Sequence, residues 1–413
     1  MKKIWILMIA FLLVSCINFA KEQAPMLGTE MGELNPDVVA QVEELFVESG
    51  IPSMALAIVG EDELLWAKGY GEQSDLSTAY MVGSIDKAYV TTAFLGQVED
   101  GLIGLEDDIS DYLPFELRNP NDPDVPITPR MLVSHQSGLA HDVPGLRYVD
   151  NDGPMLWWRF WNLEKNFWDL WYAIIPFGDT RFEVVEKALE EGDPDEVWSG
   201  RLNEGFQYSN TGLYDILGRA VGGLQGGTYQ DVVRRRVFEP LELKNTSFEA
   251  SSFPKQQLAI PYARFENGYR RMPVTGLSAS GRLRSNVLDL ARFMALHMND
   301  GALEDVKILS SESIVQMHAR DVELSGTDFP SMELYGFGWG WLLWGGDLMG
   351  HTGAVPGFYS QMVYRDVKTP YGVVLMMNTG CSVVECDFQW FDDYFVAIRE
   401  ILMEEAARLV EGQ

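Results

Sequence analysis

Three short groups of polar residues follow one another along the chain and together supply what acyl transfer through a serine ester requires. The first is Ser84-Ile85-Asp86-Lys87, which places a hydroxyl and an amine three residues apart. Three residues are about one helical turn, so both side chains reach the same face of a helix. A serine hydroxyl needs a base within hydrogen-bond reach, and a lysine can be that base when its surroundings lower its pKa from about 10.4. The spacing therefore predicts a nucleophile, Ser84, with its base, Lys87.

The residues around Ser84 favour a helix that begins close to it. Gly83 permits a tight turn, and the apolar run 88–95 is typical of a helix. Ser84 then lies at the helix N-terminus, where free backbone N–H groups stabilise an oxyanion. Chance alone produces this spacing about once in a chain of this length. A second copy, Ser252 to Lys255, contains a proline and leads into no clear helix, so we expect it to have no catalytic role.

The second group, Tyr208-Ser209-Asn210, supplies a phenol and an amide. It follows a glycine-containing polar stretch and precedes the helix-like run 213–221. This context indicates a loop at the start of a helix, where reactive side chains are common. The alternative is a buried tyrosine followed by Asn210 as a simple helix cap.

The third group, His351-Thr352-Gly353, supplies a polar strand edge with a glycine. It lies between an aromatic strand-like segment over 335–343 and a second one over 359–364. The alternative is an ordinary hairpin with a surface histidine. Only the joint presence of the three groups makes a catalytic site the better interpretation.

These residues resemble those of the serine beta-lactamase-related family, which includes class C beta-lactamases, D-alanyl-D-alanine carboxypeptidases, D-aminopeptidases and related esterases. Further stretches are similar to signatures of that family, over 101–114, 127–139, 237–241, 245–248 and 350–358. The resemblance covers roughly residues 36–408. It implies an α/β (α+β) fold of the beta-lactamase/transpeptidase kind, in which an antiparallel β-sheet is flanked by helices and joined to a mostly helical second lobe.

The resemblance also implies a role for each residue of the first two groups. Ser84 is the acylated nucleophile, and Lys87 and Tyr208 share the general base and acid work around it. Asn210 orients a substrate amide or the Lys87 ammonium. His135, inside the 127–139 signature, is expected to support the helical lobe and not to form a second catalytic pair with Ser137.

In the third group, the resemblance implies that His351 and Thr352 line the strand that binds substrate. Gly353 lets the substrate approach the backbone closely. The backbone N–H groups of Ser84 and Ala354 form the oxyanion hole. Class C beta-lactamases carry lysine where this chain has His351, and histidine is mostly neutral near pH 7. Efficient beta-lactam hydrolysis is therefore not expected.

The predicted function is a serine hydrolase that forms a covalent acyl-enzyme on Ser84 and acts on an ester or amide, with D-amino-acid peptides among the candidates. The alternatives are a D-alanyl-D-alanine carboxypeptidase or beta-lactamase proper, and a non-catalytic penicillin-binding-type sensor. We expect a small-molecule or peptide substrate, no cofactor and no metal. The substrate and the oligomeric state stay open.

The first residues indicate export. A basic start, 1–3, followed by the apolar run 4–14, is typical of a signal peptide and too short to span a membrane. The segment that ends at Cys16 resembles a bacterial lipobox. We therefore expect a lipoprotein-type signal peptide over 1–16, lipid attachment at Cys16, a tether over 17–35 and a location in the periplasm or cell envelope. Cleavage nearer Ala20 is the alternative.

The hydrolase domain is expected to occupy 36–413. Its periodicity predicts a helix over 36–49, a hairpin over 55–70, a helical lobe over about 84–290, strands over 335–378 and a closing helix over 391–410. Strands at both ends of the chain with helices between them predict one antiparallel sheet, with the site in the cleft beside the helical lobe.

The stretch 142–203 is the least family-like and is rich in aromatic residues: Trp157, Trp158, Phe160, Trp161, Phe167, Trp168, Trp171 and Tyr172. These side chains either pack on the helical lobe, or form a lid that favours an apolar acyl group or enters the membrane interface.

The charge of the chain limits the classes of partner that it can bind, and its cysteines allow one disulfide. The chain has 31 Lys and Arg residues against 61 Asp and Glu residues, a net charge of −30 at pH 7. This charge disfavours binding to nucleic acid and electrostatic attraction to anionic lipid, so membrane attachment would depend on the N-terminal lipid. Cys381 and Cys386 could close a small disulfide loop in an oxidising compartment, which the sequence leaves open.

Overall fold

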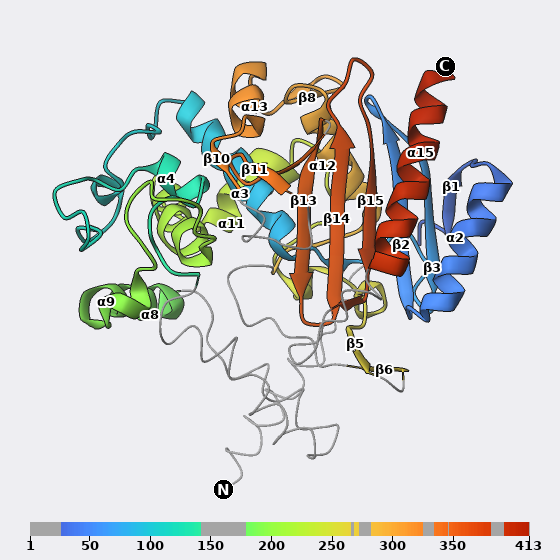
Figure 1. Ribbon diagram of the computed structural model, residues 1–413, viewed down its shortest axis with the longest axis horizontal. Coiled ribbons are helices and arrows are strands. Elements are labelled where there is room, and N and C mark those ends of the chain that lie inside the picture. The colour runs from blue at the N-terminus through green and yellow to red at the C-terminus, as the bar shows by residue number, and fades with distance from the viewer. Residues whose placement is uncertain are drawn as a thin grey trace, which may run out of the picture.

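A computed structural model describes residues 26–141, 179–265, 268–271, 282–324, 334–345, 347–380 and 392–412. Its centre is a nine-stranded sheet in the order β1-β3-β2-β15-β14-β13-β12-β11-β10, in which each neighbouring pair is antiparallel (Figure 1). The strands are β1 (Glu30–Gly32), β2 (Ser53–Gly60), β3 (Glu63–Gly71), β10 (Val322–Glu323), β11 (Leu334–Phe337), β12 (Leu342–Trp344), β13 (Leu348–Val355), β14 (Phe358–Arg365) and β15 (Tyr371–Met377). Strands from both ends of the sequence thus form one sheet, as predicted.

Helices cover both faces of this sheet, and β2 shows the consequence. All eight of its residues are buried, and successive side chains of a strand point to opposite faces. Met54, Leu56 and Ile58 pack in the core formed with α2 (Pro36–Ser49) and α15 (Ala397–Glu411). Ala55, Ala57 and Val59 pack in the core formed with α3 (Asp86–Glu99) and α12 (Val287–Met298).

The second lobe, on the left in Figure 1, is mostly helical. Its helices are α4 (Pro129–Val133), α8 (Asp179–Glu191), α9 (Pro194–Val197), α10 (Gly218–Gly223) and α11 (Tyr229–Val233), with π-helical η3 (Thr211–Leu217) and η4 (Arg234–Phe238). The small β8 (Ala302–Leu303) and β9 (Val306–Lys307) pair and α13 (Ser311–His318) follow α12 in the sequence. Together with the sheet, this confirms the predicted α/β (α+β) class.

The range 84–290 is less uniformly helical than predicted, because it also contains short strands. These are β5 (Tyr262–Phe265), β6 (Gly268–Arg271) and β7 (Arg284–Ser285), which pair with one another, with β4 (Tyr80–Met81) or with β16 (Thr379–Gly380). Strands of two to four residues are too short to show a clear two-residue period. The sequence pattern therefore could not distinguish them from loop.

The helix predicted over 36–49 begins as its sequence indicates, and α12 begins in the same way. The Asn35 side chain accepts a hydrogen bond from the backbone N–H of Asp37 (3.0 Å), and Gly50, at φ +67°, ends α2. In the same way, the Asn286 side chain accepts from the backbone N–H of Asp289 (2.8 Å) at the start of α12.

The N-terminal segment is part of the sheet from before residue 36. Strand β1 pairs with β3, and the Asp75 carboxylate accepts hydrogen bonds from the backbone N–H groups of Leu27 (3.2 Å) and Gly28 (3.0 Å). The tether predicted over 17–35 therefore extends too far at its C-terminal end. Strand β1 belongs to the sheet, where it pairs with backbone groups of β3 that would otherwise be unpaired at the edge. Cys16 lies outside the described residues.

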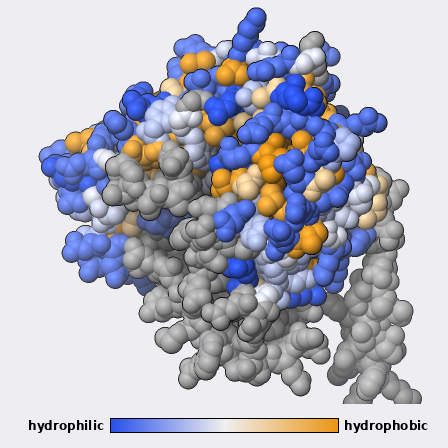
Figure 2. All heavy atoms as spheres, turned by 45° about the vertical axis from the view of Figure 1, so that its right-hand side comes forward, coloured by the Kyte–Doolittle hydropathy of each residue, from blue (hydrophilic) through white to orange (hydrophobic). Residues whose placement is uncertain are grey.

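Other predictions also fall outside the described residues: the segment 142–178, with the eight aromatic residues named above for the predicted insertion, and the pair Cys381 and Cys386. Among the helices that the structure does describe, none is both long and apolar enough to cross a membrane. Figure 2 shows a mostly hydrophilic face with scattered apolar patches, which fits the acidic composition.

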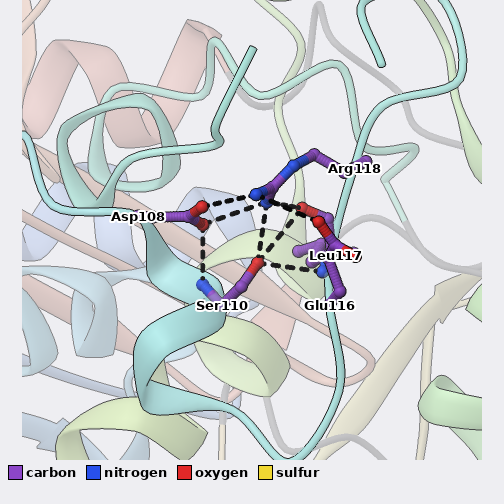
Figure 3. Close-up of polar contacts among 5 residues, drawn as sticks. All are labelled: Asp108, Ser110, Glu116, Leu117 and Arg118. Atoms are coloured by element: carbon purple, nitrogen blue, oxygen red, sulfur yellow. Dashed lines mark hydrogen bonds and ion pairs between the residues drawn. The ribbon is translucent and has the colours of Figure 1, made fainter. Parts of the chain in front are cut away.

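A charged contact holds the loop that joins α3 to α4. The Arg118 guanidinium donates hydrogen bonds to both Asp108 carboxylate oxygens (3.0 and 2.5 Å), to the Ser110 hydroxyl (2.9 Å) and to the backbone carbonyl of Leu117 (2.8 Å) (Figure 3). It also lies 3.2 Å from Glu116. Paired contacts of this kind between guanidinium and carboxylate are among the strongest that side chains make.

We expect Arg118→Ala to lower the free energy of unfolding by about 1–3 kcal/mol, because the partly buried Asp108 loses its charged partner. Urea denaturation followed by circular dichroism measures the change. Lys244→Ala is the matched control, since the Lys244–Glu242 pair is 76% and 70% exposed. An exposed pair of this kind is worth about 0–1 kcal/mol. Equal effects of the two substitutions would contradict the prediction.

Candidate active site

Ser84 and Lys87 meet as the spacing predicted. Ser84 lies in a single 3₁₀ turn, η1 (Gly83–Ile85), which leads directly into α3. The Lys87 Nζ donates a hydrogen bond to the Ser84 Oγ at 3.1 Å. Lys87 is 0% exposed, whereas Ser84 is half-buried. The Ser84 hydroxyl is thus partly accessible, and the buried Lys87 amine lies on its protein side.

Two aromatic rings flank the Lys87 side chain. Its Nζ lies 4.6 Å from the centroid of the Tyr208 ring and 4.8 Å from that of Tyr214. A cation within about 6 Å of an aromatic face is stabilised by the ring's quadrupole. Tyr208, the predicted phenol, and Ser84 therefore both contact the Lys87 amine, although they are 124 positions apart in the sequence.

Strand β13 runs close beside the turn that carries Ser84. A Cβ atom placed on Gly83, which has φ +55°, would lie 2.6 Å from the backbone nitrogen of Ala354. A Cβ atom on Gly353 would lie 1.8 Å from the Val82 carbonyl oxygen. Both positions need glycine, and together they let two backbones approach more closely than side chains allow.

This approach places the two backbones expected to form the oxyanion hole side by side. Strand β12 pairs with β13 at Met349 and Gly350. Further along β13, Gly353 and Ala354 lie beside Gly83. The backbone N–H groups of Ser84 and Ala354 thus belong to adjacent segments, as an oxyanion site requires. Ala354 is exposed, so the strand is open to substrate at this point.

His351 is buried and neutral. Only 1% of it is exposed, and its Nδ1 donates a hydrogen bond to the Thr352 carbonyl oxygen at 2.6 Å. Burial, aided by the charge of Lys87, lowers the pKa of His351 to about 3. Its Nε2 then carries a lone pair, and it is buried without a hydrogen-bond partner among the described residues. At this strand the chain therefore presents an uncharged imidazole in place of a cation.

Asn210 lies at the start of η3 and faces the last described residue before the aromatic stretch. Its backbone N–H donates to the His141 carbonyl oxygen (2.9 Å), and its side-chain nitrogen lies 3.3 Å from the His141 Nε2. Asn210 is 7% exposed, and its Oδ1 is buried without a partner in the described structure. An amide with one oxygen still unpaired can bind a donor that arrives with the substrate.

His135 supports the loop that carries Tyr208. It is 1% exposed and adopts φ +58°, and its Nδ1 accepts a hydrogen bond from the backbone N–H of Ser209 (3.1 Å). Its ring centroid lies 4.6 Å from that of Tyr208. The expected structural role therefore extends to the site itself, because His135 fixes both the backbone and the ring of the loop.

The second Ser-x-x-Lys has no comparable geometry. Ser252 ends one 3₁₀ turn, η5 (Ala250–Ser252), and Lys255 begins another, η6 (Lys255–Gln257). Both residues are exposed, and the Ser252 hydroxyl accepts a hydrogen bond from Ser247 at 3.0 Å. With Pro254 between the two turns, the pair does not share a helical face.

Four residues near the site were not predicted as functional: Asp86, His135, His141 and Tyr214. Asp86 carried a visible signal, because it is an acidic residue inside the Ser-x-x-Lys motif. His135 lay inside the 127–139 signature and was assigned only a structural role, whereas His141 and Tyr214 carried no signal that a single sequence shows. Across the ranges that the structure describes, His, Cys, Asp and Glu side chains form no group of three that could hold a metal ion.

Comparison with known proteins gives consistent matches. The family model described as Beta-lactamase matches residues 38–385. "Penicillin-binding protein 4" of Amycolatopsis lactamdurans is 27% identical over 387 residues, 88% of each chain. "Protein flp" of Staphylococcus aureus (strain MW2) is 24% identical over 83% of this chain, which spans 63% of that protein's length. Among solved structures, D-amino acid amidase from Ochrobactrum anthropi SV3 has a TM-score of 0.66 at 20% identity, covering 91% of this chain and 100% of the amidase.

Proposed function

Because the chain belongs to the beta-lactamase family, we propose that it is a serine hydrolase that forms a covalent acyl-enzyme on Ser84. The observation that carries the proposal is the 3.1 Å hydrogen bond between the half-buried Ser84 and the fully buried Lys87. A nucleophile joined to a buried amine, beside two close backbone segments, is suited to acyl transfer.

The proposed reaction has two halves. The Ser84 Oγ attacks the substrate carbonyl and loses its proton to the Lys87–Tyr208 pair, while the backbone N–H groups of Ser84 and Ala354 bind the developing oxyanion. The pair then protonates the leaving nitrogen or oxygen as its bond to the carbonyl carbon breaks. In the second half, water gives up a proton to the same pair and attacks the carbonyl carbon of the acyl-enzyme. The bond between that carbon and the Ser84 Oγ then breaks, the pair returns the proton to the Oγ, and the acid leaves.

The chemistry of β13 supports amides or esters as substrates, with D-amino-acid amides and peptides among them. A neutral His351 offers no cation to a substrate carboxylate, such as that of a beta-lactam or of a peptide C-terminus. The unpaired Oδ1 of Asn210 instead favours a group that donates a hydrogen bond. The fold is shared with an enzyme whose name states that it is a D-amino acid amidase.

A second candidate is penicillin binding, which a relative's name, "Penicillin-binding protein 4", favours. Penicillin binding would begin with the same acylation of Ser84 as the proposed hydrolysis. The two functions differ in the stability of the acyl-enzyme, which is hydrolysed quickly by a hydrolase and persists in a penicillin-binding protein. We also propose, from the sequence alone, that the chain is exported and anchored by lipid at Cys16. Incorporation of radiolabelled palmitate that is lost in Cys16→Ser tests the anchor, and equal labelling of both proteins would exclude it.

Labelling with a fluorophosphonate tests the central proposal. We expect one label per chain, located on Ser84 by mass spectrometry and absent from Ser84→Ala. A panel of a D-amino acid amide, a nitrophenyl ester, a D-Ala-D-Ala peptide and nitrocefin then ranks the substrates, and we expect the first two to be hydrolysed fastest. A wild-type protein that takes up no label would remove the hydrolase assignment.

A further inference from the structure

A buried carboxylate and a buried phenol form a pair next to Lys87. Asp86 is the first residue of α3 and is 0% exposed, and Tyr214 of η3 is 2% exposed. The Tyr214 hydroxyl donates a hydrogen bond to the Asp86 Oδ1. The two residues are 128 positions apart, so the contact exists only in the folded lobe. The catalytic steps above make no use of either side chain.

The Asp86–Tyr214 pair reaches Lys87 through the tyrosine ring. The Lys87 Nζ lies 4.8 Å from the ring centroid of Tyr214, whose hydroxyl is bound to the carboxylate. A phenol that donates to a carboxylate gains electron density in its ring, which makes the ring face more attractive to a cation. Through the Tyr214 ring, the Asp86 carboxylate therefore stabilises the charge of the Lys87 amine without needing to contact it.

A π-helical stretch holds Tyr214 in this position. Residues Thr211–Leu217 form η3 directly after Asn210, and Tyr214 lies in its middle. A π-helical turn contains about one more residue than an α-helical turn, which re-aims the side chains that follow, and such turns occur often at functional sites. The ring of Tyr214, inside η3, and the ring of Tyr208, three residues before η3, both lie within 5 Å of the Lys87 Nζ, at 4.8 and 4.6 Å.

Four other side chains in the described part of the structure interact with Lys87. Ser84 accepts its hydrogen bond, and Tyr208 offers a second ring at 4.6 Å. His135 and His351 have pKa values lowered by burial and by the charge of Lys87, so both are neutral near pH 7. Asp86 thus supplies a negative charge that Ser84, His135 and His351 do not.

We propose that Asp86 and Tyr214 are positioning residues that hold Lys87 as an ammonium in the resting enzyme. This inference rests on the proposed function, and it adds a charged partner to the Lys87–Tyr208 pair. The Lys87 ammonium stabilises the negative charge that develops on the Ser84 Oγ during its attack on the carbonyl carbon.

The pH dependence of fluorophosphonate labelling tests this inference without knowledge of the substrate. The alkaline limb of the labelling rate should report loss of the Lys87 ammonium. In Asp86→Asn and in Tyr214→Phe we expect that limb to move to lower pH by about 0.5 unit or more. The double variant should move no further, because both substitutions break one pathway.

Tyr229→Phe is the matched control, since its ring lies 6.2 Å from that of Tyr214 and the substitution also removes one hydroxyl. It should leave both limbs in place. A uniform loss of rate at every pH in the Asp86 and Tyr214 variants, or a shift of the acid limb alone, would overturn the inference. Tyr214→Phe keeps the ring, so it remains informative if Asp86→Asn does not fold. A wild-type protein without label defeats the proposed function instead, so the two failures are distinguishable.

Discussion

Lys87→Met is expected to slow acylation of Ser84 by about 10²–10⁴-fold, the range that a positioned proton-transfer or charge-stabilising group contributes. Methionine has nearly the length of lysine and suits a site that is 0% exposed between two aromatic rings, so the variant should fold. Only the amine that contacts the Ser84 Oγ is removed. The rate constant of fluorophosphonate labelling, measured with turnover of a nitrophenyl ester, gives the size of the loss.

Tyr208→Phe should cause a loss of similar size. The variant keeps the ring that packs 4.6 Å from His135 and removes the phenol alone. Because Lys87 and Tyr208 act as one unit, the double variant should be little slower than either single one. Additive losses would show that the two residues act in separate steps.

The chain supplies its own control for this experiment. Lys255→Met and Ser252→Ala alter the second Ser-x-x-Lys, whose residues are exposed and belong to different 3₁₀ turns. Both variants should be labelled and turn over substrate at the wild-type rate. If Lys255→Met slowed acylation as much as Lys87→Met, the assignment of Ser84 as nucleophile would fail.

The parts of the site that the sequence predicted are those that local geometry decides. Ser84 and Lys87 are neighbours on one turn, so their spacing alone implied the contact at 3.1 Å. The long strands and helices were visible for the same reason, because each repeats its period over enough residues, as α2 does over 14. Strands of two or three residues, such as β1, have no period to detect.

The contacts that the sequence did not reveal are those between distant segments. His135 binds the backbone of Ser209, 74 positions away, and Tyr214 binds Asp86, 128 positions away. Which tyrosine reaches which carboxylate depends on the packing of η3 against α3, and on a π-helical turn that no propensity scale indicates. A resemblance to a family identifies the residues of its motifs. It does not identify the neighbouring residues that position those motif residues or affect their charge.

Two further histidines form a buried chain that joins α3 to β14. The Thr92 hydroxyl donates to the Ala88 carbonyl oxygen (2.7 Å), so it must accept from the His297 Nε2 (3.2 Å). The His297 Nδ1 therefore accepts from the His318 Nε2 (3.2 Å), and the His318 Nδ1 accepts from the Tyr364 hydroxyl (3.1 Å). Each histidine has one donor and one acceptor in use, so both are neutral.

Protonation of these histidines opposes folding. Burial lowers the pKa of His297 well below 6.5 and that of His318 to about 3, and burial likewise lowers the pKa values of His135 and His351. The unfolded chain, in which histidine titrates near 6.5, therefore binds more protons than the folded chain below that pH. Stability must fall as pH decreases from about 6.5 toward 3, by up to about 1.4 kcal/mol per pH unit for each histidine.

Two carboxyl groups act in the opposite direction. Burial raises the pKa of Asp289 to about 6, against the hydrogen bonds from Thr246 and Asn245 that lower it, and burial also raises the pKa of Asp366. A carboxyl with a raised pKa stabilises the fold as pH decreases, and for Asp289 this occurs from about 6 toward 3.8. Asp289 and Asp366 therefore offset part of the loss, but four histidines outweigh two carboxyl groups, and the net expectation remains lower stability in acid.

The free energy of unfolding in urea, measured between pH 7.5 and 5, should therefore decrease in the wild-type protein and decrease about half as steeply in His297→Gln/His318→Gln. Glutamine keeps a donor and an acceptor in the chain of hydrogen bonds and does not titrate. His141→Gln changes an exposed histidine outside this chain of hydrogen bonds and is the matched control. Because the other charges of this acidic chain change equally in all three proteins, the difference in slope isolates the buried pair. An unchanged slope in the double variant would show that His297 and His318 are protonated in the folded state.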